Sequence, residues 1–348
     1  MNEDGFDWGG SYSCEWRLME VDPRTWDDSS EVNGVMSLSV SRDSDGELID
    51  EGSAIISMDP GEAPHEFWGR IEVLAGNGGV YRRQAIATLY FIPGKSTVRK
   101  GRKLVDYACM SVLYPASTRS LLAGSNFAKG AEGGSYVTRL LSDCTPAPVS
   151  STEMFALQED VVYAEGTKYL EAAWMLLKAA NWCLRISEMG EISVQPMPED
   201  PSLVLDVANA RLLNPEIEVD NGLEDAINRY IAATDDRVAI AVDDSDSPSS
   251  YTVRGFYVDE YDSSPQLLDG ESLDEYCQRR LDELSGTLGT RTYGRAFFPD
   301  VLPFDVVEGS IASVGLDCTM RVVSQSIDIG HGVHLTETAE VIDTWQST

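Results

Sequence analysis

Few residues in this sequence could do acid–base or metal chemistry. The three histidines are His65, His331 and His334, and the last two lie across and beyond a glycine-rich turn, where two side chains seldom converge on one ion. The sequence has no G-x-S-x-G nucleophile elbow and no G-x-x-x-x-G-K-[ST] phosphate loop. Carboxylate pairs suited to glycoside hydrolysis are expected by chance among 58 acidic residues. We therefore predict no catalytic residue and no bound cofactor, and the protein is not expected to be an enzyme.

Two acidic stretches contain the residue types of a calcium loop. Asp43-Ser44-Asp45-Gly46-Glu47 resembles the start of such a loop, because alternating carboxylates are typical Ca²⁺ ligands. It lacks the glycine at the sixth position and the later spacing, and the stretch 243–246 has the same weakness. We predict that both are solvated turns and that the protein has no metal site.

The cysteines and the termini bear on where the chain folds. Six scattered cysteines form no C-x-x-C pair, which excludes the common zinc-ribbon and thioredoxin-like patterns. The N-terminus lacks the basic start and apolar stretch of a secretory signal, and no apolar run is long enough for a membrane span. We expect the chain to be made and folded in the cytoplasm without membrane insertion, with its thiols reduced and mostly buried.

The charge of the chain is strongly negative. Asp and Glu number 58 against 26 Lys and Arg, which gives a net charge of −32. A protein that grips phosphates needs a basic footprint, so the sequence argues against nucleic-acid binding. Two interpretations stay open: a solvated acidic surface, adapted to salt or not, and a non-adhesive wall past which DNA slides.

One short segment departs from this composition. Five basic residues lie between positions 95 and 103, either on a solvated loop or as a docking patch for an acidic neighbour. They are Lys95, Arg99, Lys100, Arg102 and Lys103.

The apolar pattern predicts two β regions. Alternation of apolar and polar residues at 36–40, 54–58 and 238–242 is typical of half-buried strands. Turns at 76–79 and 330–332 predict hairpins that join 71–73 to 81–92 and 327–329 to 333–335. We expect the segment 35–92 and the segments 217–242 and 320–343 to form two similar β units.

An α/β segment separates the two regions. Apolar residues at helical spacing from Tyr169 to Leu177 predict a helix with Thr167 as its cap, followed by a hairpin around Met189-Gly190. A second helix is indicated by the capping box Ser272/Glu275, with one apolar face that includes Cys277 and Leu284.

The order of several short motifs resembles phage tail hub proteins, the ring-forming components of a tail tip or baseplate. The residues that carry the resemblance are the segment Tyr12–Trp26 with its Val-Asp-Pro-x-Thr-Trp corner, Gly34, Glu51-Gly52-Ser53-Ala54, Ser111–Ser117 and Pro303–Val307.

This resemblance implies a mainly β fold with α/β insertions: two tail-tube-like β-barrels plus small peripheral domains. Its layout is a flexible tail at 1–13, a first barrel region at 14–125, an α/β insertion at 126–200, and a second barrel at 201–290 (with an inserted loop and helix) and 291–348.

In function, the resemblance implies a structural virion protein: a homotrimeric hub ring that closes the distal end of a tail tube, adapts its symmetry and leaves a DNA channel. The implied partners are further copies of itself, the distal tail or tail-tube ring, the tape-measure protein and a tip or receptor-binding protein, with DNA only in transit. The implied location is the virion tail, after assembly in the host cytoplasm. Because the chain stops at Thr348, we expect any cell-wall-degrading activity to belong to a separate protein.

Two alternatives remain. A receptor- or carbohydrate-binding tail-tip protein would expose aromatic side chains on loops, for which Phe67-Trp68 is the best candidate, although the same pair could be core. A cell-wall hydrolase is disfavoured by the lack of histidine and cysteine constellations.

Overall fold

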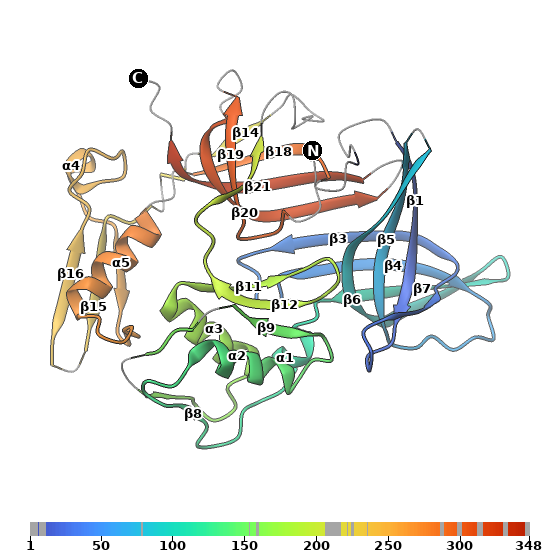
Figure 1. The fold of residues 1–348 in the computed structure, drawn as a ribbon, viewed down its shortest axis with the longest axis horizontal. Helices are drawn as coiled ribbons and strands as arrows, with labels where there is room; N and C mark the ends of the chain where they lie inside the picture. Colours follow the sequence, from blue (N-terminus) through green and yellow to red (C-terminus); the bar gives the residue numbers. More distant parts are fainter. Residues whose placement is uncertain are drawn as a thin grey trace.

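One long sheet organises most of the chain in the computed structural model (Figure 1). The structure describes residues 6, 12–77, 79–152, 154–157, 160–205, 217–220, 222–223, 226–234, 236–285, 289–297, 301–311, 316–329 and 333–344. Most of the expected tail at 1–13, His331 and the turn at 330–332 lie outside this range. The main sheet has 13 strands, and most pairs in it are antiparallel. The protein is mainly β with α/β parts, as the sequence predicted.

The first half of this sheet comes from the N-terminal third of the chain. The predicted hairpin is confirmed, since Ile71 pairs with Ala87 and Asn77 with Val80. Its core holds Leu18, Ile71 and Phe91, each with no more than 1% of its surface exposed. The strands are β1 (Ser13–Val21), β2 (Asp28–Glu31), β3 (Val35–Asp43), β4 (Asp50–Met58), β5 (Phe67–Asn77), β6 (Val80–Arg99) and β7 (Arg102–Met110).

The alternation on β3 and β4 is confirmed with one correction. Val40, Ala54 and Ile56 are buried, as a two-residue period requires. Met36 is instead 65% exposed. The pairing of β3 with β4 shifts register between Val35 and Ser37, and such a bulge turns the following side chain out of the pattern.

The second half of the sheet comes mainly from the C-terminal part. Ile327 pairs with Leu335 and Ile329 with Val333, which confirms the predicted strand pairing. The core of this half contains Val307, Met320 and Val341. Its strands are β13 (Pro201–Leu205), β14 (Glu218–Asp220), β18 (Thr290–Ala296), β19 (Val306–Ile311), β20 (Leu316–Ile329) and β21 (Val333–Thr344).

The two halves join where β3 pairs with β20. Val40 lies opposite Ile327, and Asp43 lies opposite Ser324. A buried polar connection crosses the same junction: Arg42 Nη1 donates to Gln325 Oε1 at 3.0 Å, and Gln325 Nε2 donates to Glu337 Oε2 at 2.8 Å. Buried side chains that are hydrogen-bonded across a strand junction in this way favour one register of the strands.

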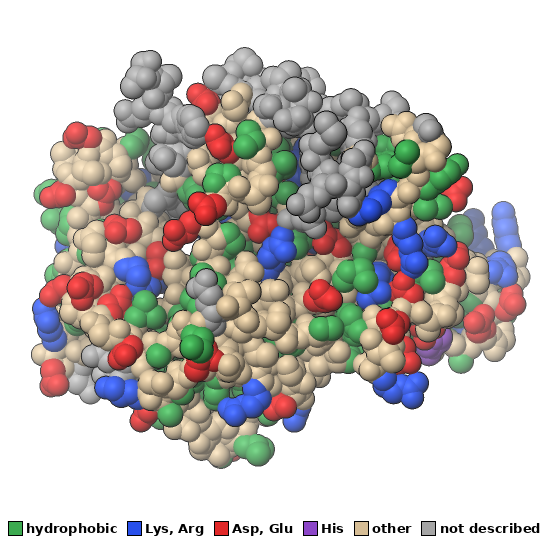
Figure 2. Space-filling model, viewed as in Figure 1, with side chains coloured by type: hydrophobic (Ala, Val, Ile, Leu, Met, Phe, Trp, Pro, Cys, Tyr) green, Lys and Arg blue, Asp and Glu red, His purple; other side chains and the backbone are tan. Residues whose placement is uncertain are grey.

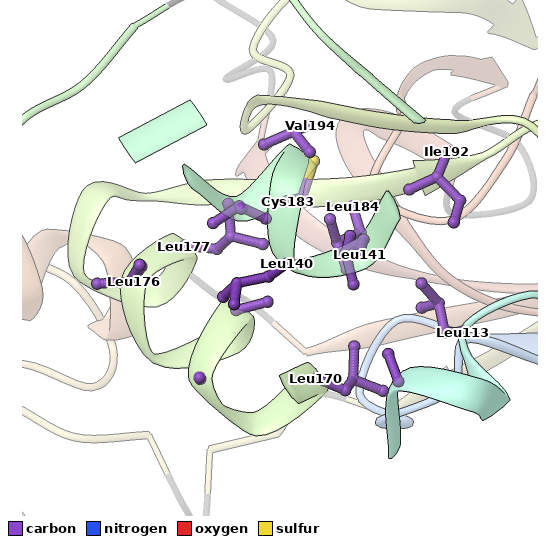
Figure 3. Close-up of a cluster of buried hydrophobic side chains, with 14 of the residues drawn as sticks. Leu113, Leu140, Leu141, Leu170, Leu176, Leu177, Cys183, Leu184, Ile192 and Val194 are labelled. Atoms are coloured by element: carbon purple, nitrogen blue, oxygen red, sulfur yellow. The ribbon is translucent and has the colours of Figure 1, made fainter. Parts of the chain in front are cut away.

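The α/β module below the junction has its own apolar core, in which leucines of two helices meet one face of a small sheet (Figure 3). Figure 3 shows Leu140 and Leu177 near Leu184 and Val194. The predicted hairpin is confirmed by the pairs from Trp182↔Pro196 to Ile186↔Ile192. The elements are α1 (Tyr114–Thr118), β8 (Asn126–Phe127), α2 (Gly133–Ser142), β9 (Val149–Ser151), β10 (Val161–Val162), α3 (Tyr169–Ala180), β11 (Trp182–Ile186) and β12 (Ile192–Pro196).

The cap expected for α3 is wrong. The Thr167 hydroxyl donates to the Ala164 carbonyl at 2.9 Å instead of accepting from the helix. Lys168 takes the cap position, and its backbone N–H donates to the Glu171 carboxylate at 3.2 Å. A hydroxyl that is already hydrogen-bonded within the preceding turn does not also cap the helix.

A separate small module lies at the left end of the molecule in Figure 1. In it β15 (Arg229–Ala233) pairs with β16 (Val238–Val242) and β17 (Asp259–Asp262), and α5 (Leu273–Ser285) packs on one face; α4 (Tyr251–Arg254) lies in the connection. The expectation that 217–242 shares a sheet with 320–343 is therefore wrong for 229–242. β15 and β16 lie in a sheet of their own, in which α5 covers the face that carries Ala232, Ala239 and Ala241.

The capping box of α5 is confirmed: the Ser272 N–H donates to the Glu275 carboxylate at 2.8 Å, and the Glu275 N–H donates to Ser272 Oγ at 3.3 Å. Cys277 is buried, as predicted, together with Leu273, Tyr276 and Leu281, whereas Leu284, expected on the same face, is 37% exposed. None of the described helices is long and apolar enough to cross a bilayer.

Candidate assembly surfaces

In both acidic turns a carboxylate accepts a hydrogen bond from a backbone N–H two residues further along the chain. Asp43 Oδ1 accepts from the Asp45 N–H at 2.9 Å, and Asp243 Oδ1 accepts from the Ser245 N–H at 3.0 Å. No group of three or more histidine, cysteine, aspartate or glutamate side chains within the described ranges could share a metal ion. Both stretches have the form of capped turns.

The surface hollows are open to solvent, and their linings are mixed polar and apolar. A hollow of about 500 Å³ lies at the junction of the two halves of the sheet and is bordered by Ser41, Ser324 and Thr336. Another, of about 420 Å³, contains His65 together with Glu62 and Arg102. Small-molecule sites are usually concave and mostly apolar, so neither hollow resembles one.

Phe67 and Trp68 are core residues. Only 6% and 7% of their surfaces are exposed. Phe67 stacks on Phe91 with ring centroids 4.8 Å apart, and Trp68 lies 5.5 Å from Trp26. Phe67 therefore belongs to the core of the first half of the sheet and Trp68 to the core of the α/β module, so the pair is not an exposed receptor-binding site.

The basic cluster lies on a β-hairpin, not on a loop. β6 and β7 turn at Lys100 and Gly101, which have φ angles of 50° and 73°, and β4 pairs with β7 as far as Met58↔Lys103. Two successive residues with positive φ are typical of the tight turn that best fits the twist of a hairpin. Figure 1 shows this hairpin reaching the right end of the molecule. We call residues 94–102 the arm; all nine are exposed.

The five basic side chains divide into two groups. Arg102 Nη1 lies 2.6 Å from Asp59 Oδ1, and Lys103 Nζ donates to the Glu62 carbonyl at 3.0 Å, so these two bind the arm's base to the adjacent loop. Lys95, Arg99 and Lys100 are exposed and have no ion pair with any described residue. The free charge is thus concentrated near the tip, in Figure 2 at the right edge.

The outer edge of the arm is open. β5 pairs with β6 only as far as Phe67↔Phe91. From residue 92 to 99, the pairs described for β6 are with β7 alone. A free strand edge presents backbone donors and acceptors that another chain can pair with.

The small module has an apolar face that the sequence analysis missed. On β16 the alanines Ala239 and Ala241 are buried against α5, whereas Val238 and Ile240 are 58% and 56% exposed. Tyr261 on β17 is 61% exposed, and Ile231 between them pairs with both strands. Alternation at 238–242 was the available signal, but it does not say which face the helix covers.

Aromatic residues extend this face. Tyr251 and Tyr257 stack with centroids 4.3 Å apart, and the Arg229 guanidinium lies 4.0 Å from the Tyr257 ring centroid. Phe256 is 57% exposed beside them in the chain. We call Ile231, Val238, Ile240, Tyr257 and Tyr261 the outer face.

Comparison with known proteins identifies the fold. No protein-family model matches the sequence, and no curated protein sequence matches it. Among solved structures, a tail protein from Neisseria meningitidis MC58 is similar over 94% of this chain and 97% of its own, with a TM-score of 0.64 and 12% identity. The 43 kDa tail protein of prophage MuSo2 from Shewanella oneidensis matches over 94% and 98%, with a TM-score of 0.65 and 12% identity.

The prophage tail protein gp18 from Listeria monocytogenes EGD-e is similar over 93% of this chain and 94% of its own, with a TM-score of 0.54 and 10% identity. In all three cases nearly the whole of both chains is aligned, so the modules as well as the main sheet correspond. The resemblance that the sequence motifs indicated is confirmed for the fold: this chain has the fold of phage and prophage tail proteins.

Proposed function

We propose that the protein is a structural component of a phage-type tail that forms a homotrimeric hub ring at the distal end of the tail tube. The observation that carries this proposal is the near-complete alignment with three tail proteins, over at least 93% of either chain. The shared fold accounts for almost all of this chain.

Assembly by strand edges and charges supports the ring. The open edge of β6 and the exposed cations Lys95, Arg99 and Lys100 are available to a neighbouring copy. A free strand edge is a template for pairing with another chain. In the proposed ring a neighbour covers the arm, which acts with Lys103 as the docking patch: Lys95, Arg99 and Lys100 meet the neighbour, while Arg102 and Lys103 hold the base of the arm.

The negative charge suits a channel through which DNA passes. Each cationic contact with phosphate adds affinity and slows transit. With a net charge of −32, the ring is proposed to line its lumen with more Asp and Glu than Lys and Arg, and to point the arm away from it. The remaining proposed partners are the tail-tube ring, the tape-measure protein and a tip protein, all in the virion tail.

The proposed role is non-enzymatic and needs no cofactor. The described hollows are open to solvent with mixed polar and apolar linings, and the acidic turns use their carboxylates to cap their own backbone. Purified protein is expected to release nothing from host cell walls. Lysis that depends on dose and on a single carboxylate would contradict this part of the proposal.

A second candidate function is a receptor- or carbohydrate-binding tail-tip protein. The exposed side chains of Tyr251, Tyr257 and Tyr261 favour it, with Phe256 beside them in the chain, since rings with one polar end, as in tyrosine, are frequent at binding surfaces.

Light scattering on the purified protein tests the proposal over a range of concentrations and salt. We expect a species with three times the 38.1 kDa mass of the chain. A monomer under all conditions, with or without a tail-tube protein, would overturn the hub.

A further inference from the structure

The outer face has the apolar composition of a surface that a binding partner covers. A sheet that packs a helix on one side normally puts its large aliphatic residues toward that helix. Here the small Ala239 and Ala241 face α5, while Val238 and Ile240 face outward with more than half of each surface exposed. Contiguous exposed apolar residues of this kind mark protein interaction sites.

The loop that follows β16 specifies the charge of an occupant that pairs along the edge of this strand. Asp243, Asp244 and Asp246 follow β16 directly. Burial raises the pKa of Asp243, but hydrogen bonds from Ser245 and Ser247 outweigh it and lower that pKa below its ordinary value, so the carboxylate stays charged. The occupant must therefore be apolar in part and cationic in part.

The free edge of the sheet specifies the shape of the occupant. β16 is the last strand in the order β16-β15-β17, so one side of its backbone is free within the described structure. An extended segment can add to such an edge with main-chain hydrogen bonds and place alternate side chains on the face.

The arm of this same chain meets all three requirements. It is extended, and its outer edge is open between residues 92 and 99. Val98 is 65% exposed, and Lys95, Arg99 and Lys100 flank it without an ion pair in the described structure. Charge complementarity in a protein this acidic selects the arm over other segments of its surface.

The positions of the two surfaces require a second copy. Figure 1 is oriented with the longest axis horizontal, and the arm lies at one end while the small module lies at the other. They cannot meet within one chain. Contacts between different surfaces of identical subunits are head-to-tail, and such contacts close into rings when the rotation allows.

We propose that the arm of one copy docks on the outer face of the next, with Val98 against Ile240 and Val238, and with Lys95 and Lys100 near Asp244 and Asp246. This interface rests on the proposed function, because it is the contact that would build the ring. Its experiments separate the two claims.

Sedimentation equilibrium of charge variants is the first test. Lys95→Glu with Lys100→Glu is expected to weaken self-association at least tenfold. The matched control is Lys129→Glu with Lys178→Glu, which makes the same charge change at two exposed lysines elsewhere and should leave association unchanged. Adding Asp244→Lys and Asp246→Lys to the arm variant exchanges the charges and should restore association.

A disulfide cross-link is the second test. The double variant Val98→Cys, Ile240→Cys should give covalent oligomers up to the size of the ring on oxidation. Each single variant, and the wild type with its six native thiols, should give only background.

The outcomes are distinct. A wild-type trimer that the arm variant leaves intact would overturn this interface but keep the hub, and a wild-type monomer would overturn both. If Ile240→Asp leaves the trimer intact and abolishes binding to host cells or cell-wall saccharide, the outer face belongs to a receptor and the interface is wrong.

Discussion

Arg295 on β18 and Glu337 on β21 form a two-pronged ion pair that is wholly removed from solvent. Arg295 Nε donates to Glu337 Oε1 at 3.0 Å, and Nη2 donates to Oε2. The Tyr293 hydroxyl donates to Oε1 at 2.7 Å, and Gln325 donates to Oε2. The carboxylate thus has a donor for each of its bonding directions, deep in the half of the sheet that joins β3.

Removing one member of this pair should destabilise the fold strongly. Arg295→Met leaves a buried carboxylate without its counter-charge, and we expect a loss of about 3–5 kcal/mol in the free energy of unfolding. Arg295→Met with Glu337→Leu removes both charges and should cost much less. Urea unfolding measures both variants; equal losses for the single and the double variant would contradict the strong coupling of the pair.

Asp50 predicts a pH dependence. Its carboxyl is buried, and Arg42 Nε lies 3.6 Å from Oδ1, too far for a hydrogen bond, so neither atom has one in the described structure. Burial raises the pKa of Asp50 to about 6; Arg42 opposes the shift and Glu188 adds to it. A raised folded-state pKa gives stability that is complete below the unfolded value of 3.8 and is lost as the pH rises through about 6.

Asp50→Asn removes this titration. Relative to wild type, the variant should gain about 3 kcal/mol in unfolding free energy between pH 4 and about pH 7, from a shift of roughly two pH units. Unfolding curves of both proteins at several pH values give the difference, in which all other titrations cancel. A difference that is constant with pH would show that Asp50 is ionised normally.

Gly190 predicts a close contact between the α/β module and the main sheet. Its φ is +76°, and an added Cβ would lie 2.8 Å from Thr88 Cβ and 3.0 Å from the Trp26 ring. Gly101 has φ +73° with nothing within 4 Å, so it is the matched control for backbone strain alone. Gly190→Ala should cost about 1–3 kcal/mol more than Gly101→Ala in chemical denaturation. Similar costs would mean that the hairpin tip does not press on the sheet.

The thiols should differ in reactivity. Burial raises the pKa of Cys109 and Cys183 to about 12, and the thiolate is the reactive form. Cys277 and Cys318 are also buried, whereas Cys14 and Cys144 are only half-buried. Titration of native protein with a chromogenic disulfide at pH 8 should detect at most the last two, and a Cys14→Ser, Cys144→Ser variant should give no signal until it is unfolded.

Local structure could be predicted where it depends only on a short stretch of sequence. The alternation at Val40, Ala54 and Ile56 and the capping box Ser272/Glu275 need only neighbours in the chain, and both are confirmed. The pairing of β3 with β20 joins residues as far apart as Arg42 and Gln325, 283 positions away, and no local signal selects that partner.

The candidate site was predictable only in part. The basic cluster was visible as composition, but its division into anchored and free cations depends on Asp59 and Glu62, which the fold brings to the arm's base. The sequence did not reveal the outer face, because a two-residue period separates the two faces of a strand but does not say which of them a helix covers. Small alanines let α5 approach closely, so the larger Val238 and Ile240 were left outside.

Electron microscopy of the purified protein tests most directly whether the chain forms a hub ring. We expect class averages with threefold symmetry, an open centre and the small modules in contact with neighbouring arms. Particles of single-copy size at every concentration, or closed assemblies without a central opening, would contradict a ring that leaves a channel for DNA.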